Sequence, residues 1–357
     1  MSLTRSACLL LVLSLSACSE SPATTPGSGG AGGSSAGTGG TPQGGSGGSA
    51  GTGGSVTGTG GAASGGSSGS GGAAGNDAGP ADAPPEVAAE VAPETSAGGF
   101  KKQWSCPAGV VGPGTVGPQM PVCAGFRFNF TYHEGPTWIA SQNAFFFSNF
   151  TEGNGRTGDI IKFSLTTNMC EVFIKDAGCN GLAVHANGKL IGACHLTHSV
   201  TEFDPVTKEK RVIVDQYMGR NLASPNDIVA HSNGTIYFTN PTYESISTNP
   251  YPQATFWIDP MGKIALLANG ASNGIALSPD EKKLHVVQAG VWNLDDQGVP
   301  GMRTGGGPGG DGISVDCAGG IHSIGTNSAY GGADGKTIFI ASRQGVFTAQ
   351  SNIPGLP

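Results

Sequence analysis

The sequence predicts an all-β fold of the β-propeller class. Five polar residues recur in the second half of the chain at steps of 46, 46, 47 and 38 residues: Glu134, Asn180, Asn226, Asn273 and Asp311. Each begins a similar phrase, in which a short apolar segment, a turn and a second apolar segment follow one another. A repeat of about 40–50 residues built from strands and Gly- or Asn-containing turns is typical of a propeller.

Each phrase has the pattern of a β-hairpin. Asn187-Gly188 and Asn233-Gly234 each stand between two apolar runs, and Asn-Gly in that position is a strong hairpin signal. The sequence shows no convincing long amphipathic helix. We expect the outer strands of the first three blades at 160–165 with 171–174, 200–203 with 210–214, and 254–258 with 263–267.

The repeat shortens towards its end. Only 16 residues separate Asp311 from Asn327, and four strands of about five residues with three turns do not fit in that length. We therefore expect a fifth blade of two strands, within 312–316 and 321–325. The outer half of the fourth blade is compressed into 290–304, and the last strands follow within 331–347. One side of the barrel is then thin, so that a partner covers it or the channel opens sideways.

The repeated polar residues predict a metal site. The innermost strand of every propeller blade lines one central channel, so equivalent positions in successive blades converge on its axis. Carboxylates and carboxamides that meet there form an oxygen-only pocket, which suits Ca²⁺ and related divalent ions. We expect one divalent ion per domain, with Ca²⁺ the best match to these donors.

The first 18 residues have the pattern of a lipoprotein signal peptide. Arg5 supplies the positive charge, and Leu9–Leu13 is an apolar core too short to span a bilayer. Leu15–Cys18 has the form of a bacterial lipobox, in which Cys18 is lipidated and becomes the new N-terminus. The alternative is an ordinary signal peptide with cleavage near Ala17. Ser19 at the next position favours the outer membrane, so we expect a lipid-anchored protein of the cell envelope.

Residues 19–99 predict a disordered tether. They are mostly Gly, Ser, Thr and Ala and then become rich in Pro, Ala and Glu. A stretch with almost no large apolar side chains cannot offset the entropy of ordering its backbone. The remaining 258 residues, 100–357, are enough for one propeller domain.

Charge and cysteine content limit the partners of this domain. The chain carries a net charge of −7, but the 19 acidic and 17 basic residues of 100–357 leave the domain near −2 with no basic run. Nucleic acid is therefore excluded as an expected partner. Six cysteines in an exported domain permit disulfides in fifteen pairings. Proximity in sequence favours Cys106 with Cys123 and Cys170 with Cys179, and no spacing indicates a zinc site.

Six segments carry a recognisable combined pattern: HEGPTWIASQNAFFF, NGLAVHANGKLIGACH, SPNDIVAHSNGTIYFTNPTYE, SNGIALSPDEKKL, GGDGISVDCAGGIHSIG and GGADGKTIFIASRQGVFTA. Together they resemble the gluconolactonase/senescence marker protein (regucalcin) family over about 130–357. The resemblance implies a six-bladed β-propeller, here with a shortened fifth blade and preceded by the disordered tether. It also implies a divalent metal held by Glu134, Asn226, Asn273 and Asp311. Asn180 is not usually a ligand in the family, and we interpret it as a channel-lining residue near the substrate.

The resemblance further implies hydrolysis of a lactone or related ester. Metal ions in such sites polarise the carbonyl group while a carboxylate activates water. Asp227 resembles the residue that serves as the base, and Asp311 is the other candidate catalytic residue. Some members bind a sugar through an Arg at the position of Ser224, and Arg220 is a candidate substitute at the substrate site.

Two other functions are compatible with the sequence. A non-catalytic propeller with a structural metal, acting as an extracytoplasmic binding module, is favoured by the eroded fifth blade and by Ser224. A strictosidine-synthase-like propeller is weaker because it gives no reason for the oxygen donors. In the lactonase hypothesis the partners are a small-molecule lactone or ester and, through the lipid anchor only, a membrane.

We expect the tether to be dispensable for folding. Deletion of residues 19–99 should leave the melting temperature of the domain unchanged, because the composition of that stretch offers nothing to pack against the propeller. Thermal unfolding of the full-length and shortened chains tests this. A large fall in melting temperature would place the domain boundary before residue 99.

Overall fold

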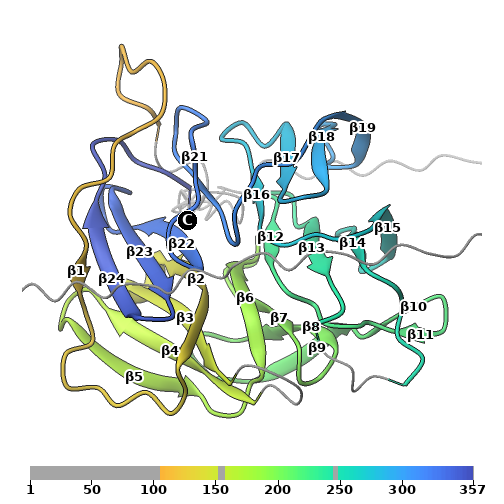
Figure 1. Ribbon diagram of the computed structural model, residues 1–357, viewed down its shortest axis with the longest axis horizontal. Coiled ribbons are helices and arrows are strands. Elements are labelled where there is room, and N and C mark those ends of the chain that lie inside the picture. The colour runs from red at the N-terminus through yellow and green to blue at the C-terminus, as the bar shows by residue number, and fades with distance from the viewer. Residues whose placement is uncertain (1–104, 152–156, 244–247, 357) are drawn as a thin grey trace, which may run out of the picture. The chain divides into compact units, whose positions relative to one another are not determined.

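Antiparallel strands and turns make up the computed structural model, which describes residues 105–151, 157–243 and 248–356 (Figure 1). The predicted signal peptide, Cys18 and the whole of the predicted tether, 19–99, lie outside these residues. The strands form five four-stranded and two two-stranded sheets. A single turn of 3-10 helix, Ala140–Gln142, interrupts them. Among the described residues no helix is long and apolar enough to cross a membrane.

The first three four-stranded sheets follow one another along the chain, each with its strands in sequence order. The first comprises β2 (Tyr132–Ile139), β3 (Ala144–Phe150), β4 (Gly158–Ser164) and β5 (Met169–Ile174). The second comprises β6 (Cys179–Val184), β7 (Leu190–Cys194), β8 (Ser199–Phe203) and β9 (Lys210–Val214), and the third β12 (Ile228–Ala230), β13 (Ile236–Asn240), β14 (Ala254–Ile258) and β15 (Ile264–Asn269). The expected outer strands of these sheets are all present. A small hairpin, β10 (Gln216–Tyr217) with β11 (Arg220–Asn221), lies between the second and third sheets in sequence.

The later sheets are less regular. The fourth comprises β16 (Ile275–Leu277), β17 (Lys283–Val286), β18 (Gly290–Leu294) and β19 (Pro300–Gly305), and the fifth has only β20 (Ser314–Val315) and β21 (Ile321–His322). The last sheet comprises β22 (Asn327–Gly331), β23 (Thr337–Ser342), β24 (Gly345–Gln350) and the early strand β1 (Met120–Pro121). The prediction of a two-stranded fifth sheet is confirmed. The prediction of a compressed fourth sheet is wrong, because 290–305 forms a complete β18–β19 hairpin.

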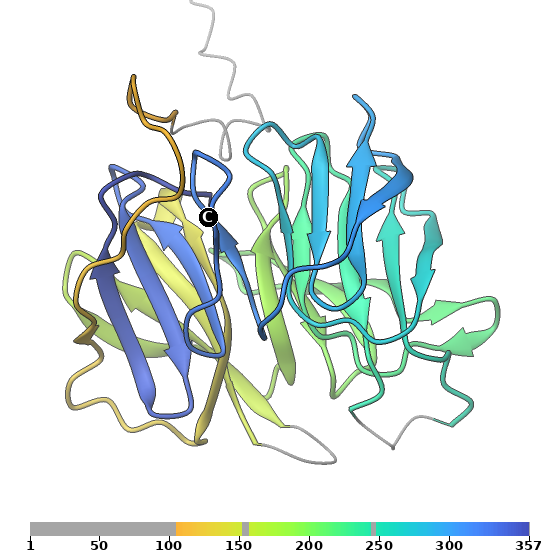
Figure 2. The same ribbon diagram turned by 45° about the horizontal axis from the view of Figure 1, so that its top comes forward.

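The first strands of these six sheets form a closed ring. β2 contacts β6, and contacts continue through β12, β16, β20 and β22 back to β2. Figure 2 shows β22 and β23 beside β2 and β3, so that segments from the two ends of the described chain lie together. β1 pairs with β24 as the outermost strand of the last sheet. This strand comes from before Glu134, so the segment after Glu134 supplies four complete four-stranded sheets and three strands of a fifth.

Apolar side chains from neighbouring sheets pack between them. One cluster joins the first and second sheets around Phe146 and Leu190, and another joins the second and third around Ile191 and Phe238. The first and last sheets meet through Phe145 and Phe339, whose ring centroids are 5.2 Å apart. Only a small cluster, which includes Ala276, Val315 and Leu356, packs at the two-stranded sheet. Sheet-to-sheet packing is therefore least extensive at the two-stranded sheet.

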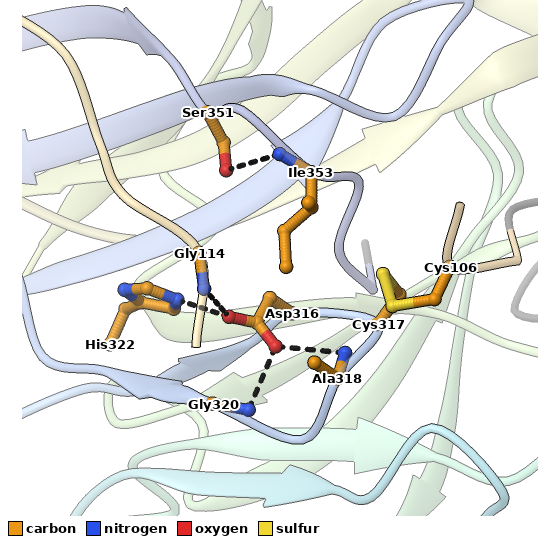
Figure 3. The surroundings of a disulfide bond; sticks show 9 residues. All are labelled: Cys106, Gly114, Asp316, Cys317, Ala318, Gly320, His322, Ser351 and Ile353. Carbon is orange, nitrogen blue, oxygen red and sulfur yellow. Dashed lines mark hydrogen bonds and ion pairs between the residues drawn. A yellow bond between two sulfur atoms is a disulfide. The ribbon is translucent and has the colours of Figure 1, made fainter. Parts of the chain in front are cut away.

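The chain itself covers the two-stranded sheet. Figure 3 shows the Asp316 carboxylate accepting hydrogen bonds from the backbone of Gly114 (2.7 Å), Ala318 (2.9 Å) and Gly320 (2.8 Å), and 2.9 Å from Nε2 of His322. On the C-terminal side, the backbone amides of Cys317 and Leu356 donate to Pro354 and Val315. The expected thin side is thus covered by segments from both ends of the domain, and this corrects the expectation of a partner or a sideways opening.

The disulfides differ from those expected. Cys106 pairs with Cys317, Cys123 with Cys170, and Cys179 with Cys194. The predicted pairs Cys106–Cys123 and Cys170–Cys179 are wrong because they were chosen by distance along the chain. Cys179 and Cys194 face each other across β6 and β7. Of the other two pairs, Cys123–Cys170 fastens the segment before β2 to β5 of the first sheet, and Cys106–Cys317 fastens it to the turn between β20 and β21.

We expect loss of the Cys106–Cys317 disulfide to destabilise the domain. Both cysteines are half-buried, so the double change Cys106→Ala, Cys317→Ala removes little packing but releases a cross-link spanning 211 residues. The free energy of unfolding should fall by about 2–5 kcal/mol, the range for removal of native disulfides. Denaturant unfolding of the variant measures this loss, and an unchanged midpoint would show that the segment is held without the cross-link.

Candidate active site

The repeated polar residues lie at the start of the first strands and meet at one end of the ring. Nδ2 of Asn180 donates to Oδ1 of Asn226, Nδ2 of Asn226 to Oδ1 of Asn273, and Nδ2 of Asn273 to Oδ1 of Asp311. Each of these hydrogen bonds is 2.7 Å long. The four side chains therefore form a continuous relay across four neighbouring sheets. We call the end of the ring that carries them the polar end.

Glycine after the polar residue allows the first strands to come this close. A Cβ atom on Gly181 would lie 2.7 Å from the Asn226 carbonyl oxygen, and one on Gly274 would overlap the carbonyl of Asp311. The Gly181 amide instead donates to Asn226 O at 2.7 Å, and that of Gly274 to Asp311 O at 3.0 Å. The Asn-Gly pairs are thus required for the contact between neighbouring first strands as well as for the relay.

Three carboxylates share the polar end. Burial raises the pKa of Glu134 well above its usual range, and the negative charges of Asp311 and Asp227 raise it further. Burial likewise raises the pKa of Asp227 to about 7, although hydrogen bonds from two backbone amides oppose the shift. Glu134 and Asp227 are only 4% and 5% exposed. Burial and mutual repulsion therefore disfavour ionisation of Glu134 and Asp227 at this end of the ring.

Asp227 occupies the position that glycine takes in the neighbouring phrases. Its Oδ1 accepts from its neighbour Ile228 N at 3.0 Å, and its Oδ2 accepts from Ile275 N at 3.1 Å and from Asn327 Nδ2 at 3.4 Å. The carboxylate consequently links β12 to β16 and to β22. Asp227 lies next to the relay residue Asn226 in the chain, and its oxygens accept hydrogen bonds from residues of three first strands.

Asn327 is a site residue that the sequence reasoning did not assign. Its side chain donates to Asp227 and also hydrogen-bonds Glu134, an interaction that lowers the pKa of that carboxyl. It begins β22, the sixth first strand, and so stands where the repeat would place a sixth polar residue. The sequence does place an Asn at the start of the last unit. It follows Asp311 by only 16 residues, so its equivalence to the other repeated polar residues was not recognised.

The donors at the polar end suit a hard divalent cation. Glu134, Asn226, Asn273 and Asp311 offer carboxylate and carboxamide oxygens, the ligands that Ca²⁺ prefers. The buried carboxylates with raised pKa values need a compensating positive charge, which a cation would supply. Within the described residues no group of three or more His, Cys, Asp or Glu side chains could hold a metal alone. Two carboxylates would therefore need the amide oxygens of the relay.

A cavity of about 60 Å³ lies within the ring beside Asp227 and Asn327. All six first strands contribute to its wall, and Leu356 from the C-terminal segment also lines it. Most of its other lining residues are apolar, among them Leu182, Ile275 and Ile313. The volume is sufficient for water, so Asp227 separates the carboxylates of the polar end from a small, largely apolar chamber.

The two other predicted substrate residues have partners of their own. Ser224 is fully buried, and its backbone amide donates to Oδ1 of Asn240 at 3.1 Å. Arg220, on β11, donates to the carbonyl of Pro250 at 2.5 Å and stacks over the ring of Tyr251 at 5.6 Å. Asn180 contacts a candidate metal ligand directly, through its hydrogen bond to Asn226.

Comparison with known families agrees with the repeat. A family model described as "SMP-30/Gluconolactonase/LRE-like region" matches residues 132–323, which is more than half of the chain. A gluconolactonase from Zymomonas mobilis is 32% identical over 196 residues, an alignment that covers 48% of this chain and 55% of that protein. The chain therefore spans about half the length of this curated relative.

Solved structures share the fold. A gluconolactonase from Xanthomonas campestris is 22% identical with a TM-score of 0.54, over 66% of this chain and 98% of that one. A calcium-binding regucalcin from Agrobacterium tumefaciens is 16% identical with a TM-score of 0.52, over 68% and 95%. With the family match over 132–323, these results lead to one conclusion: the chain belongs to the SMP-30/gluconolactonase/LRE-like family.

Proposed function

We propose that this protein is a metal-dependent hydrolase that opens the ring of a lactone or related cyclic ester, on a six-bladed propeller with one short blade. The observation that carries the proposal is the relay that fixes Asn226, Asn273 and Asp311 beside the buried Glu134. Its support from relatives is the similarity to a gluconolactonase.

In this proposal Glu134, Asn226, Asn273 and Asp311 hold one divalent ion, with Ca²⁺ the best match. The ion supplies Lewis-acid polarisation of the ester carbonyl and stabilisation of the negative charge that develops on its oxygen. The relay holds each amide plane in place, because the Nδ2 of one residue is committed to the next side chain. Each amide oxygen retains a second lone pair for a ligand.

Asp227 is the proposed general base. Its pKa of about 7 is close to neutral pH, where a base combines a substantial ionised fraction with useful affinity for a proton. The hydrogen bonds to Ile228, Ile275 and Asn327 orient the carboxylate, which can take a proton from water on a remaining lone pair. Asp311, at the end of the relay, is the second candidate catalytic residue.

We also propose that Cys18 anchors the protein in the cell envelope by a lipid, with 19–99 as a disordered tether. The three disulfides support an oxidising compartment. The membrane is a partner only through this anchor, and nucleic acid is not a partner because the domain has no basic run.

A non-catalytic binding module with a structural metal is the alternative. Two observations favour it: Ser224 is buried where some relatives have an Arg, and the Asp227 carboxylate accepts three hydrogen bonds that hold the ring together. The two functions differ in turnover and agree in metal binding.

The proposal is tested with purified protein by metal analysis and a panel of lactones, with and without chelator. The wild type should contain one divalent ion and hydrolyse a lactone, and chelator should stop turnover. Asp311→Ala should abolish both properties, while Asn180→Ala should retain the metal. Metal without turnover on any lactone would favour the binding module, and absence of divalent binding would refute the ligand assignment.

Asp227→Asn should retain the metal and lose activity by about 10²–10⁴-fold, the usual contribution of a general base. The structure adds a second effect. The new amide group would face donors that now bind the carboxylate, which costs about 1–3 kcal/mol for an unsatisfied group. Kinetics and thermal unfolding of the same variant separate the two effects. Near-normal turnover with a lowered melting temperature would make Asp227 structural and leave Asp311 as the base.

Calcium should stabilise the protein more at pH 8 than at pH 5. Folded Asp227 keeps its proton up to about pH 7, whereas an unfolded Asp loses its proton near 4. In the absence of a cation, the free energy of unfolding therefore falls as the pH rises from about 4 to about 7, because the unfolded chain loses the Asp227 proton and the folded chain keeps it. A cation must displace the same proton at pH 5 but not at pH 8. The measurement is the calcium-induced rise in melting temperature at both pH values, which cancels titrating groups that do not interact with the ion. An equal rise at both pH values would contradict the coupling.

A further inference from the structure

The turn between β23 and β24 lies at the polar end of the ring. Asn327 pairs with Ala341 in the last sheet, so Ser342–Gly345 extends just beyond the start of β22. Two hydrogen bonds fix its position relative to β2. Nδ1 of His133 lies 3.0 Å from the carbonyl oxygen of Ser342, and the Thr326 hydroxyl donates to the carbonyl of His133 at 2.6 Å.

This turn places Arg343 on Tyr132. The guanidinium carbon lies 4.9 Å from the centroid of the tyrosine ring. Tyr132 precedes Glu134 by two residues on β2, and residues two apart in a strand project to the same side. The Tyr132 hydroxyl is a hydrogen-bond partner of the Arg343 side chain and lies within electrostatic reach of Glu134 and Asp311. Arg343 is exposed and its head can meet a ligand.

Arg343 lies in one of the turns that join the second and third strands at this end. The described residues that join the second and third strands of the four-stranded sheets are Thr151 and Thr157, 195–198, 241–243 with 248–253, 287–289 and 343–344. Arg343 is the sole Arg or Lys among them. A site built from carboxylates and amide oxygens attracts cations, so it needs a separate donor to hold the oxygens of a neutral ligand.

The two residues expected to provide that donor are engaged elsewhere by the contacts described above. Ser224 is buried, and Arg220 is bound to Pro250 and Tyr251. Arginine presents five N–H donors in a planar fork and stacks readily on aromatic rings. The stacking on Tyr132 holds that fork beside a hydroxyl that can also donate or accept a hydrogen bond.

We propose that Arg343 and Tyr132 form a substrate-positioning pair, which hydrogen-bonds the hydroxyl groups that a lactone carries away from its ring carbonyl. The inference rests on the proposed lactone hydrolysis and identifies residues that select its substrate. Hydroxyls suit this position better than an anionic group, because Glu134, Asp227 and Asp311 repel negative charge. The pair thus takes the role that Ser224 and Arg220 leave open.

The experiment compares two lactones and two arginine variants in the full chain with Ca²⁺. Glucono-δ-lactone carries hydroxyls, and δ-valerolactone has the same ring without them. The test variant is Arg343→Ala. The matched control is Arg303→Ala, because Arg303 is also exposed and lies 5.9 Å from an aromatic centroid, that of Trp292, on the outer strand β19.

Arg343→Ala should raise KM for glucono-δ-lactone about 10–100-fold, the equivalent of a lost hydrogen bond to a charged group, with little change in kcat. Its kcat/KM for δ-valerolactone should stay within about twofold of the wild type. Arg343→Lys should recover part of the loss, and Tyr132→Phe should raise KM by about 2–10-fold. Arg303→Ala should match the wild type on both substrates.

Equal losses on both lactones, or the same behaviour for the two alanine variants, would overturn the pair's role. If the wild type opens no lactone, the proposed function fails, and calorimetric binding of 1,5-anhydroglucitol, a neutral ring with the same hydroxyl groups and no ester, decides the inference separately. Binding that is weaker in Arg343→Ala than in Arg303→Ala supports the pair as a binding site for hydroxylated ligands. Equal or absent binding in these proteins refutes it.

Discussion

The close approach of neighbouring first strands at the polar end is the constraint on which the site depends. Gly181 and Gly274 leave no space for a side chain between one strand and the next, and their amides bond to the neighbouring carbonyl oxygens. This contact brings the side chains of Asn180, Asn226 and Asn273 within hydrogen-bonding distance of the next member of the relay. The backbone spacing that closes the ring and the geometry that presents oxygen donors are therefore one feature.

The repeat explains why much of this could be predicted. An Asn-Gly turn indicates the local backbone conformation, and a polar residue at constant spacing indicates equivalent positions in successive sheets. Both signals can be recognised in short segments of the sequence. The same reasoning failed where the determining contact is between distant segments. Met120–Pro121 forms the outermost strand of the last sheet, but a strand of two residues is too short to show a periodic pattern in the sequence. The disulfide between Cys106 and Cys317 depends on the tertiary fold, which brings together segments 211 residues apart in sequence.

The short fifth sheet shows how the ring tolerates loss of two strands. Asp316 replaces missing strand contacts by binding backbone amides of its own turn and of Gly114 in the N-terminal segment. The C-terminal segment adds Leu356, which packs on Val315 and lines the central cavity. Both ends of the domain meet at this sheet and supply contacts in place of the two missing strands. These contacts lie away from the relay, and Asp311 keeps its hydrogen bond to Asn273.

Asp227 connects the structural and chemical requirements of the site. Neighbouring phrases carry glycine at this position, so a side chain here must be accommodated between strands, and the carboxylate achieves this by accepting hydrogen bonds from β16 and β22. Those bonds favour ionisation while burial opposes it, and the balance places the pKa near 7. Stability alone would not favour a third carboxylate beside Glu134 and Asp311, because repulsion between ionised carboxylates destabilises the ring. The arrangement becomes favourable when a cation occupies the same end, and this links the stability of the ring to the chemistry that we propose for it.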